Sequence, residues 1–296
     1  MQRLIEPALD PAYEEPAAAS AEIATLLDAE TASGTAALRD GELVGFLLGS
    51  ERDESWGPNV WVEPAGHAVT ELELVRDLYA EAAARWVAAG RTSHYAIVPA
   101  TDPALVDAWF RLGFGHQHVH AIREPAVSSD EIEAPPGLLV RPPRRDDLET
   151  LARIDVALPE HQALAPVFSP LPVPSVAEMR DELEADFDDP RFTTFVVERD
   201  GEVIGATVGC AIEVSSMHKS LALPRGAGFL GFAAVLPEHR GSGAGRVLGE
   251  TVLAWARDAG YPAVVTDWRM TNVLASRAWP GLGFRPTFYR LHRAIV

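Results

Sequence analysis

The chain has 296 residues, of which 47% are apolar and 23% are charged. This length suffices for about two domains of ordinary size, each with its own core. No apolar stretch approaches the roughly 20 residues that cross a bilayer, and the first residues turn acidic before an apolar signal region forms. Because Cys210 is the only cysteine, the composition predicts a cytoplasmic protein without disulfides.

The net charge of −18 is distributed unevenly along the chain. Residues 1–135 carry 8 Lys or Arg against 23 Asp or Glu, whereas residues 136–296 carry 17 against 20. A field this negative repels a phosphate backbone, so we expect no nucleic-acid partner. The same field attracts a cationic small molecule, although high acidity also serves solubility alone. We further expect no membrane partner, and a monomer or a homodimer.

The first half alternates strand-like and helical stretches. Asp40-Gly41 supplies a tight hairpin turn, and a short strand follows over 59–62. The next helix has its apolar face at Val75, Leu78, Ala82 and Trp86. Between this strand and this helix, residues 63–68 contain neither alternating glycines nor an arginine, and they begin with a carboxylate. We therefore expect no anion-binding turn in the first half.

A segment with three prolines and no apolar period follows the first half. We expect domains at 1–125 and 138–296, joined by a linker at 126–137. The second half predicts, in order, strand 138–140, helix 146–156, strands 192–198, 203–212 and 228–236, helix 248–259, strand 264–265, helix 272–279 and closing strand 287–291. Asp200-Gly201 forms another hairpin turn. The alternation of strands and helices indicates an α/β (α+β) fold.

The end of the second half repeats the end of the first. The residues concerned are Asn272, Ala275, Trp279, Gly283 and Phe284. Their counterparts, each 170 positions earlier, are Asp102, Leu105, Trp109, Gly113 and Phe114. Solenoid repeats have periods of about 20–50 residues, so a period of this length indicates a duplicated domain.

The stretch 235–246 joins a strand to a helix through three alternating glycines. Such a turn aims backbone N–H groups at one point and adds them to the positive end of the helix dipole. It suits an anion such as a diphosphate, with Arg240 and Arg246 at the rim, and tight packing accounts for it equally well. The spacing fits neither a Walker loop nor a dinucleotide fingerprint.

Taken together, these residues resemble the GNAT superfamily of acyl-CoA-dependent N-acyltransferases. The run Val-x-Pro-x-x-Arg-Gly-x-Gly-x-Gly at 235–245 is followed by Asn-x-x-Ala-x-x-x-aromatic-x-x-x-Gly-Phe at 272–284. The likeness covers 138–296 well and 35–122 weakly. It implies two tandem GNAT-like domains, each a mixed, bent central sheet flanked by helices, with the fourth and fifth strands splayed around acyl-CoA. The first copy is then degenerate, binds no CoA, and stabilises the active half or walls its acceptor pocket.

The resemblance also implies a set of site residues. Backbone groups of Ala233 and Val235 pair with the pantetheine arm, and the Val235 N–H donates to the thioester carbonyl. The residues expected to hold the diphosphate are Arg240, Gly241, Ser242, Gly243, Ala244, Gly245 and Arg246. Those expected near the lower pantetheine and the thiol are Asn272, Ser276 and Trp279.

Position 279 departs from the family pattern. Many members have a tyrosine there as the acid that protonates the leaving thiolate, whereas an indole loses no proton near neutral pH. The competing interpretation of Trp279 is a core aromatic that closes its helix onto the sheet. Asn272 similarly has a second interpretation, as the cap of the same helix.

The acceptor side is less sharply defined by the sequence. Asp267 is the expected base, which acts on the amine through a water molecule; the alternative is that it only begins a loop. Glu213 and His218 are expected in the acceptor pocket; the alternative is that they lie on the surface. A proline-rich apolar stretch at 157–175 precedes an acidic stretch. Together they would suit an amine with a hydrophobic body; the alternative is a rigid loop followed by a solvated helix. Cys210 is read as a core residue, and no Cys/His set has metal-ligand spacing.

We therefore expect an N-acetyltransferase that moves an acetyl or other short acyl group from acyl-CoA to a primary amine of a small molecule. Attack is direct, without a covalent enzyme intermediate, and acetyl-CoA is the co-substrate with no metal. A non-catalytic acyl-CoA-binding sensor or scaffold is the alternative that Trp279 supports. A dinucleotide-dependent oxidoreductase is disfavoured by the spacing of the glycine turn.

Overall fold

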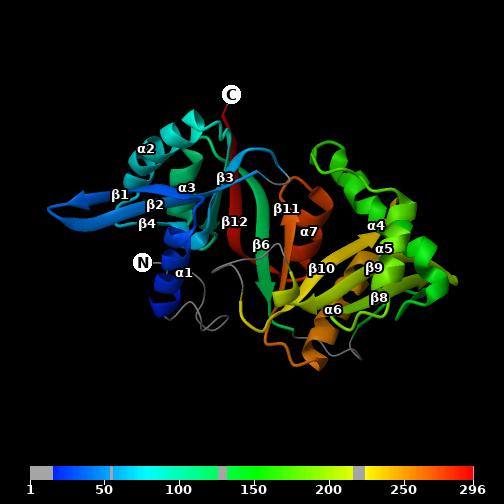
Figure 1. Cartoon of the computed structure of the whole chain (residues 1–296). Coiled ribbons are helices and arrows are strands. Elements are labelled where there is room, and N and C mark those ends of the chain that lie inside the picture. Colours follow the sequence, from blue (N-terminus) through cyan, green and yellow to red (C-terminus); the bar gives the residue numbers. More distant parts are fainter. Residues whose placement is uncertain (1–15, 54–55, 126–131, 216–223, 296) are drawn as a thin grey trace. The chain divides into compact units, whose positions relative to one another are not determined.

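The computed structural model describes residues 16–53, 56–125, 132–215 and 224–295, which form two compact units (Figure 1). Unit 1 holds the described residues up to Ala121 and from Pro286 onward. Unit 2 holds the described residues from Ile122 to Arg285, apart from 224–225. Among the described residues, no helix is both long and apolar enough to span a membrane.

Unit 1 is a mixed sheet with helices packed on it. The strands are β1 (Ala32–Arg39), β2 (Glu42–Arg52), β3 (Asn59–Val62), β4 (His67–Val69), β5 (Ser93–Pro99), β6 (Gly115–Arg123) and β12 (Arg285–Ala294). The helices are α1 (Pro16–Asp28), α2 (Leu74–Ala88) and α3 (Pro103–Phe110), with a 3-10 turn η2 (Pro64–Gly66). The strand order is β1-β2-β3-β5-β12-β6, and β4 pairs with β2. Trp86 of α2 and Trp109 of α3 lie fully buried in the core against β2, β3 and β5.

The last strand of the chain completes the sheet of unit 1. β12 pairs antiparallel with β5, from Phe288 opposite Pro99 to Ala294 opposite Ser93, and Leu291 is buried in the core of this unit. The sequence predicts the strand itself but assigns it to the second half. The pairing arises because β5 is almost entirely buried and its backbone groups need a partner on each side. The expected domains at 1–125 and 138–296, with a linker at 126–137, stay a prediction.

Unit 2 is a mixed sheet in the order β11-β10-β9-β8-β7 (Figure 1). The strands are β7 (Leu138–Arg141), β8 (Phe192–Arg199), β9 (Glu202–Ala211), β10 (Gly228–Val235) and β11 (Val264–Arg269). The helices are α4 (Leu148–Ala163), α5 (Val176–Asp186), α6 (Ala244–Asp258) and α7 (Val273–Gly281), with 3-10 turns η4 (Arg145–Asp147), η5 (Ile212–Val214) and η7 (Pro237–His239). α4 packs on Val196 and α6 on Val197. Since neighbouring strand residues face opposite ways, these helices cover opposite faces of the sheet.

Both units contain a hairpin with the same turn. Asp40 and Gly41 have φ values of 54° and 86°, and Asp200 and Gly201 have 53° and 87°. Positive φ at both central residues is the requirement of a type I′ turn, which matches the twist of the flanking strands. In each unit a register shift follows within the hairpin, between Ala37 and Leu38 and between 197 and 198. The predicted turns are confirmed, and the duplication extends to backbone detail.

Both units also contain a helix that is capped in the same way. The Asp102 side chain accepts from Leu105 N at 2.9 Å to cap α3, and the Asn272 side chain accepts from Ala275 N at 3.3 Å to cap α7. Trp109 and Trp279 are buried at corresponding positions. The capping interpretation of Asn272 is thereby confirmed, and the repeat with an offset of 170 residues is a structural repeat.

The partner of β12 gives a test of the fold. Leu291→Ala removes a fully buried side chain at the far end of the chain, so it should lower the free energy of unfolding by about 2–5 kcal/mol. Hydrogen exchange should show the loss at β5, residues 93–99, of unit 1. Leu139→Ala, at a site 59% exposed, is the control and should change stability by no more than about 0.5 kcal/mol. Unchanged exchange in β5 would contradict the assigned pairing.

Candidate active site

The parallel strands β10 and β11 pair only at their beginnings. The paired residues are 228–230 and 264–266, and both strands continue beyond them. At the last pair the Thr266 hydroxyl donates to the Leu230 carbonyl at 3.0 Å. A register shift against β9 falls between Leu230 and Phe232, so β10 is bulged at Gly231. The expected splay of the fourth and fifth strands is therefore present in unit 2.

Beyond the splay, β10 has an open backbone edge. Leu236 N–H donates to Ile204 O at 2.9 Å, on the side of β9. Successive residues of a strand direct their N–H and C=O groups to alternate sides. The backbone groups of Ala233 and Val235 therefore point to the side that β11 leaves, and the Val235 carbonyl accepts from Arg240 Nε there at 3.4 Å.

The turn after β10 leads into α6 through two left-handed glycines. Gly241 has φ 79° and Gly243 has φ 86°, a region that L side chains rarely adopt. Gly243 is the N-cap of α6 and supplies no side-chain cap of its own. The N–H groups of a first helical turn have no acceptor within the helix, and they lie at its positive end. The turn thus presents a backbone cradle that fits an anion such as a diphosphate.

The groups around the cradle are held in place by neighbouring residues. Ala244 N donates to Ser242 Oγ at 3.4 Å. Arg246, which is exposed, donates at 2.7 Å both to Glu250 and to the Glu133 carbonyl. A Cβ at Gly243 would stand 2.9 Å from Pro135, so both φ and space require glycine at position 243.

Two residues of α7 that are expected near the cofactor, Ser276 and Trp279, differ in burial and in contacts. Ser276, which is half-buried, donates from its hydroxyl to the Met270 carbonyl at 2.9 Å. Trp279 is buried against Gly249 of α6 and lies edge-on to Phe284 at 6.2 Å between ring centroids. This packing matches the core interpretation of Trp279. Its expected contact with the cofactor stays a prediction, as do those of Asn272 and Ser276.

The residues expected on the acceptor side lie on different segments of the chain. Asp267 lies half-buried in β11, directly after the last residue paired with β10. Glu213 is exposed in η5 and accepts from Gly226 N at 2.9 Å. His218 lies outside the described residues. Cys210 is buried in β9, and burial raises the pKa of its thiol to about 11, so no thiolate nucleophile forms there near neutral pH.

A carboxyl group on α4 was not singled out by the sequence. Burial raises the pKa of Asp155 to about 7, and the nearby Glu182 carboxylate adds to the effect. Asp155 lies two helical turns before Gln162, so both are on one side of α4. Gln162 Oε1 accepts from Arg269 Nε at 3.1 Å at the end of β11. A lone Asp in an amphipathic helix gives no sequence signal, which explains the omission.

In unit 1, buried residues occupy the place that corresponds to the glycine turn and the open strand edge of unit 2. After β3, residues 63–67 are all buried, and β4 turns back to pair with β2. His67 Nε2 lies 3.2 Å from the Ile97 carbonyl of β5, and burial lowers the pKa of this imidazole so that it is neutral. Glu63 pairs with Arg52 at 2.6 Å. A neutral side chain and a carboxylate thus stand where unit 2 has an open edge and a glycine turn.

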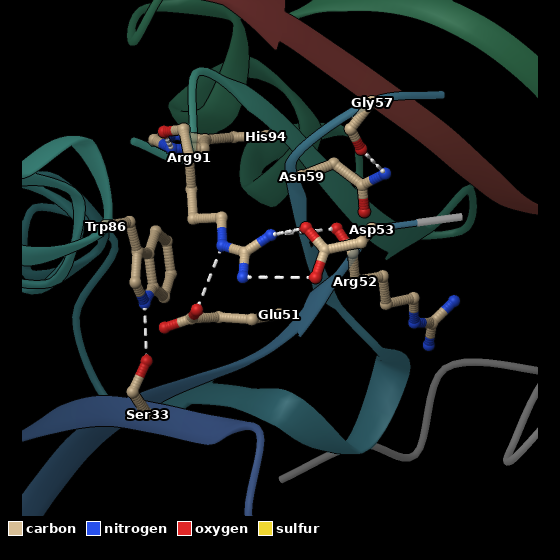
Figure 2. Close-up of polar contacts among 9 residues, drawn as sticks. All are labelled: Ser33, Glu51, Arg52, Asp53, Gly57, Asn59, Trp86, Arg91 and His94. Carbon is tan, nitrogen blue, oxygen red and sulfur yellow. Dashed lines mark hydrogen bonds and ion pairs between the residues drawn. The ribbon is translucent and has the colours of Figure 1, made fainter. Parts of the chain in front are cut away.

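A polar cluster elsewhere in unit 1 links several of its elements (Figure 2). The Arg91 guanidinium lies between Glu51, at 2.9 Å, and Asp53. The Trp86 indole donates to Ser33 Oγ at 2.7 Å. These contacts tie β1, β2 and the start of β5 together, so the cluster stabilises the fold of unit 1. Across the described residues of both units, no group of three or more His, Cys, Asp or Glu could hold a metal ion.

Comparison with known proteins agrees with this geometry. Residues 161–284 match the acetyltransferase (GNAT) family. The chain is 36% identical over 121 residues to an aminoglycoside N(6')-acetyltransferase type 1 of Stenotrophomonas maltophilia, covering 38% of this chain and 78% of that protein. It is 35% identical over 99 residues to N-acetyltransferase 8B of Rattus norvegicus, covering 33% of this chain and 41% of that protein.

A GCN5-related N-acetyltransferase from Sphaerobacter thermophilus has the same fold, with a TM-score of 0.59 and 14% identity over 99% of this chain and 90% of that one. Fold and sequence together define the protein as an N-acetyltransferase. The chain belongs to the acetyltransferase (GNAT) family.

The raised pKa of Asp155 predicts a pH-dependent stability. The pKa is 3.8 when unshifted and about 7 in the folded protein, so the free energy of unfolding falls as pH rises through this window. Asp155→Asn removes the penalty and should raise the melting temperature by about 10 °C at about pH 8, with no gain at about pH 4. Glu160→Gln, an exposed change on the same helix, is the control. An equal gain at both pH values would contradict the assignment.

Proposed function

We propose that unit 2 transfers an acetyl group from acetyl-CoA to a primary amine of a small molecule. The observation that carries the proposal is the open edge of β10 beside the glycine turn of α6. The pantetheine arm carries amide groups, which can pair with Ala233 and Val235 as a neighbouring strand would. Residues 240–246 then hold the diphosphate at the helix N-terminus.

The residues of β10 also supply the electrostatic part of catalysis. The Val235 N–H donates to the thioester carbonyl, whose oxygen gains negative charge as the amine attacks. Asn272, Ser276 and Trp279 lie on α7 and face the lower pantetheine and the thiol in this proposal. Since the indole of Trp279 releases no proton near neutral pH, position 279 provides no acid and the thiolate leaves without its help.

Two carboxyl groups can take up the proton of the amine. Asp267 of β11 acts through a water molecule in this proposal, at the point where the strands part. Asp155 on α4 has a pKa of about 7, matched to proton transfer near neutral pH. The acceptor amine itself is cationic in water and is attracted by the overall charge of −18. Glu213 and His218 are proposed to contribute to its binding.

Unit 1 is proposed to have no CoA site of its own. Its buried segment 63–67 occupies the place of the glycine turn, and Glu63 would repel a diphosphate. The proposed role of this unit is structural, in support of the active copy. The stoichiometry of binding should accordingly be one acetyl-CoA per chain.

Binding at the glycine turn can be separated from folding by Gly245→Asp. A Cβ at position 245 meets only ordinary contact, 3.9 Å from Val235, and an Asp in a first helical turn stabilises the helix. Its carboxylate would nevertheless face the diphosphate, so acetyl-CoA should bind at least about a hundredfold more weakly than to the wild type. Isothermal titration measures both affinities and the stoichiometry.

Ala104→Asp is the matched control for this variant. Ala104 is exposed and occupies the same position in the first turn of α3 in unit 1. The change in net charge is identical, and acetyl-CoA binding should stay within about twofold of the wild type. Equal binding by Gly245→Asp would show that the turn is structural, and the proposed cofactor site would be withdrawn.

Direct attack predicts that no acetyl group resides on the protein during turnover. Acid quenching of the enzyme with radiolabelled acetyl-CoA and an amine should leave the protein unlabelled, because no activated nucleophile lies in unit 2 among the described residues. Cys210→Ala should keep kcat within about twofold, since the thiol is buried and protonated. Label on Cys210 would establish a covalent mechanism instead.

A further inference from the structure

The backbone groups of β10 reverse their direction at the bulge of this strand. Before the bulge, the Gly228 N–H donates at 2.9 Å to the carbonyl of Ala263, which directly precedes β11. After the bulge, the Leu236 N–H donates at 2.9 Å to the Ile204 carbonyl of β9. Gly228 and Leu236 are an even number of positions apart, so an uninterrupted strand would direct both groups to the same side. The extra residue of the bulge therefore sets which groups of β10 point to the open edge.

Two buried threonines bind the carbonyl groups on either side of this bulge. Thr266 of β11 donates from its hydroxyl to the Leu230 carbonyl at 3.0 Å. Thr207 of β9 donates from its hydroxyl to the Phe232 carbonyl at 2.7 Å. The hydroxyls come from the two opposite neighbours of β10, so they hold the bulge at Gly231 from both sides. Both threonines are buried, at 0% and 1% exposed, so water does not compete for these bonds.

Apart from this bond, Thr207 occupies an apolar position. A Cβ at Gly209, two positions along β9, would lie 2.8 Å from the Trp255 ring of α6. Because alternate residues of a strand share a face, Thr207 lies on the face that α6 covers. Valine has nearly the same shape as threonine and would serve the packing alone, whereas a buried hydroxyl is costly without a partner. The hydroxyl of Thr207 is therefore explained by its bond to the Phe232 carbonyl at the bulge.

We propose that Thr207 and Thr266 are positioning residues, whose hydroxyls hold the bulge of β10 and thereby aim the Val235 N–H at the thioester carbonyl of the acyl donor. The inference rests on the proposed acetyl transfer in unit 2. Val235 follows Phe232 by three residues on the same strand, so a small rotation at the bulge moves its N–H group. A displacement of about 1 Å costs a catalytic group much of its effect, because hydrogen bonds to a developing oxyanion require close alignment.

The test compares two ligands that differ only at the thioester carbonyl. Acetyl-CoA carries this carbonyl, whereas S-ethyl-CoA, a thioether, has a methylene group in its place. Isothermal titration of the full chain with each ligand gives the ratio of the two affinities. This ratio isolates the hydrogen bond to the carbonyl, because all other contacts are shared by both ligands. For the wild type we expect acetyl-CoA to bind about fivefold more tightly than S-ethyl-CoA.

Thr207→Val and Thr266→Val remove the hydroxyls and keep the shape of the side chains. Each should bring the ratio below about twofold, while the affinity for S-ethyl-CoA stays within about twofold of the wild type. Thr207→Ser and Thr266→Ser keep the hydroxyls and should keep the ratio. Thr251→Val is the control, since the Thr251 hydroxyl donates to the Val247 carbonyl within α6 at 2.8 Å, and it should leave the ratio unchanged. A loss of stability alone would weaken the binding of both ligands alike.

The outcomes separate this inference from the proposed function. If the wild type binds neither ligand, the proposed function itself fails. If the wild type binds acetyl-CoA and both valine variants keep its ratio, the positioning role alone is overturned. A wild-type ratio of one would exclude the contact with the carbonyl and would overturn the positioning role as well.

A spectroscopic measurement tests the same contact without reference to affinity. Isotope-edited infrared spectroscopy of bound acetyl-CoA, labelled with carbon-13 at the thioester carbonyl, reports the hydrogen bond because a donor lowers the carbonyl stretching frequency. We expect a lower frequency in the wild-type complex than in free acetyl-CoA, and a smaller shift in the valine variants. If Thr207→Val does not fold, Thr266→Val carries the same test from the other side of the bulge. An equal shift in the wild type and in a folded valine variant overturns the proposal.

Discussion

The proposed function of unit 2 depends on two parallel strands that stop pairing before they end. Unpaired backbone groups are costly unless they meet water or a ligand, so a parted pair has to be enforced. Here a bulge at Gly231 turns β10 aside, and the Thr266 hydroxyl occupies the Leu230 carbonyl at the last point of contact. The result is a strand edge whose N–H and C=O groups are not paired with β11, and such an edge suits an amide-bearing chain such as the pantetheine of the proposed cofactor.

Unit 1 has similar local features, but its own residues fill the place that corresponds to the glycine turn of unit 2. Hairpins, caps and buried tryptophans recur in both units, so the two copies fold by the same local rules. They differ in the residues after the central parallel strand. In unit 1 the buried stretch 63–67 ends at a neutral His67 beside the Ile97 carbonyl, whereas in unit 2 glycines lead to the open N-terminus of α6. In the proposed function, this difference in a few residues separates a copy that binds the cofactor from one that does not.

Local features were predictable from the sequence because each has a local cause. The Asp-Gly turns need positive φ, the Asn272 cap needs a short polar side chain, and the glycine turn precedes an amphipathic helix. The partner of β12 was not predictable, since strand pairing over a long sequence distance leaves no mark in the strand itself. The same holds for Asp155 and Arg269, whose environments are created by α4 packing on the sheet and by the turn at 164–169. The family pattern suggests a cofactor contact for Trp279, but its observed neighbours are Gly249 and Phe284.

In the proposed reaction, the net charge of the chain and an apolar environment at the acceptor site act on the acceptor amine at different distances. Excess carboxylates attract an ammonium ion from solution, and this attraction decays over about 8 Å at physiological ionic strength. Nucleophilic attack needs the neutral amine, and an apolar surrounding disfavours the charged form. In the proposed function, Asp155, with a pKa of about 7, is one carboxyl that could take up this proton. In the proposed reaction, attraction at long range and deprotonation at short range do not conflict, because they act on the amine in succession.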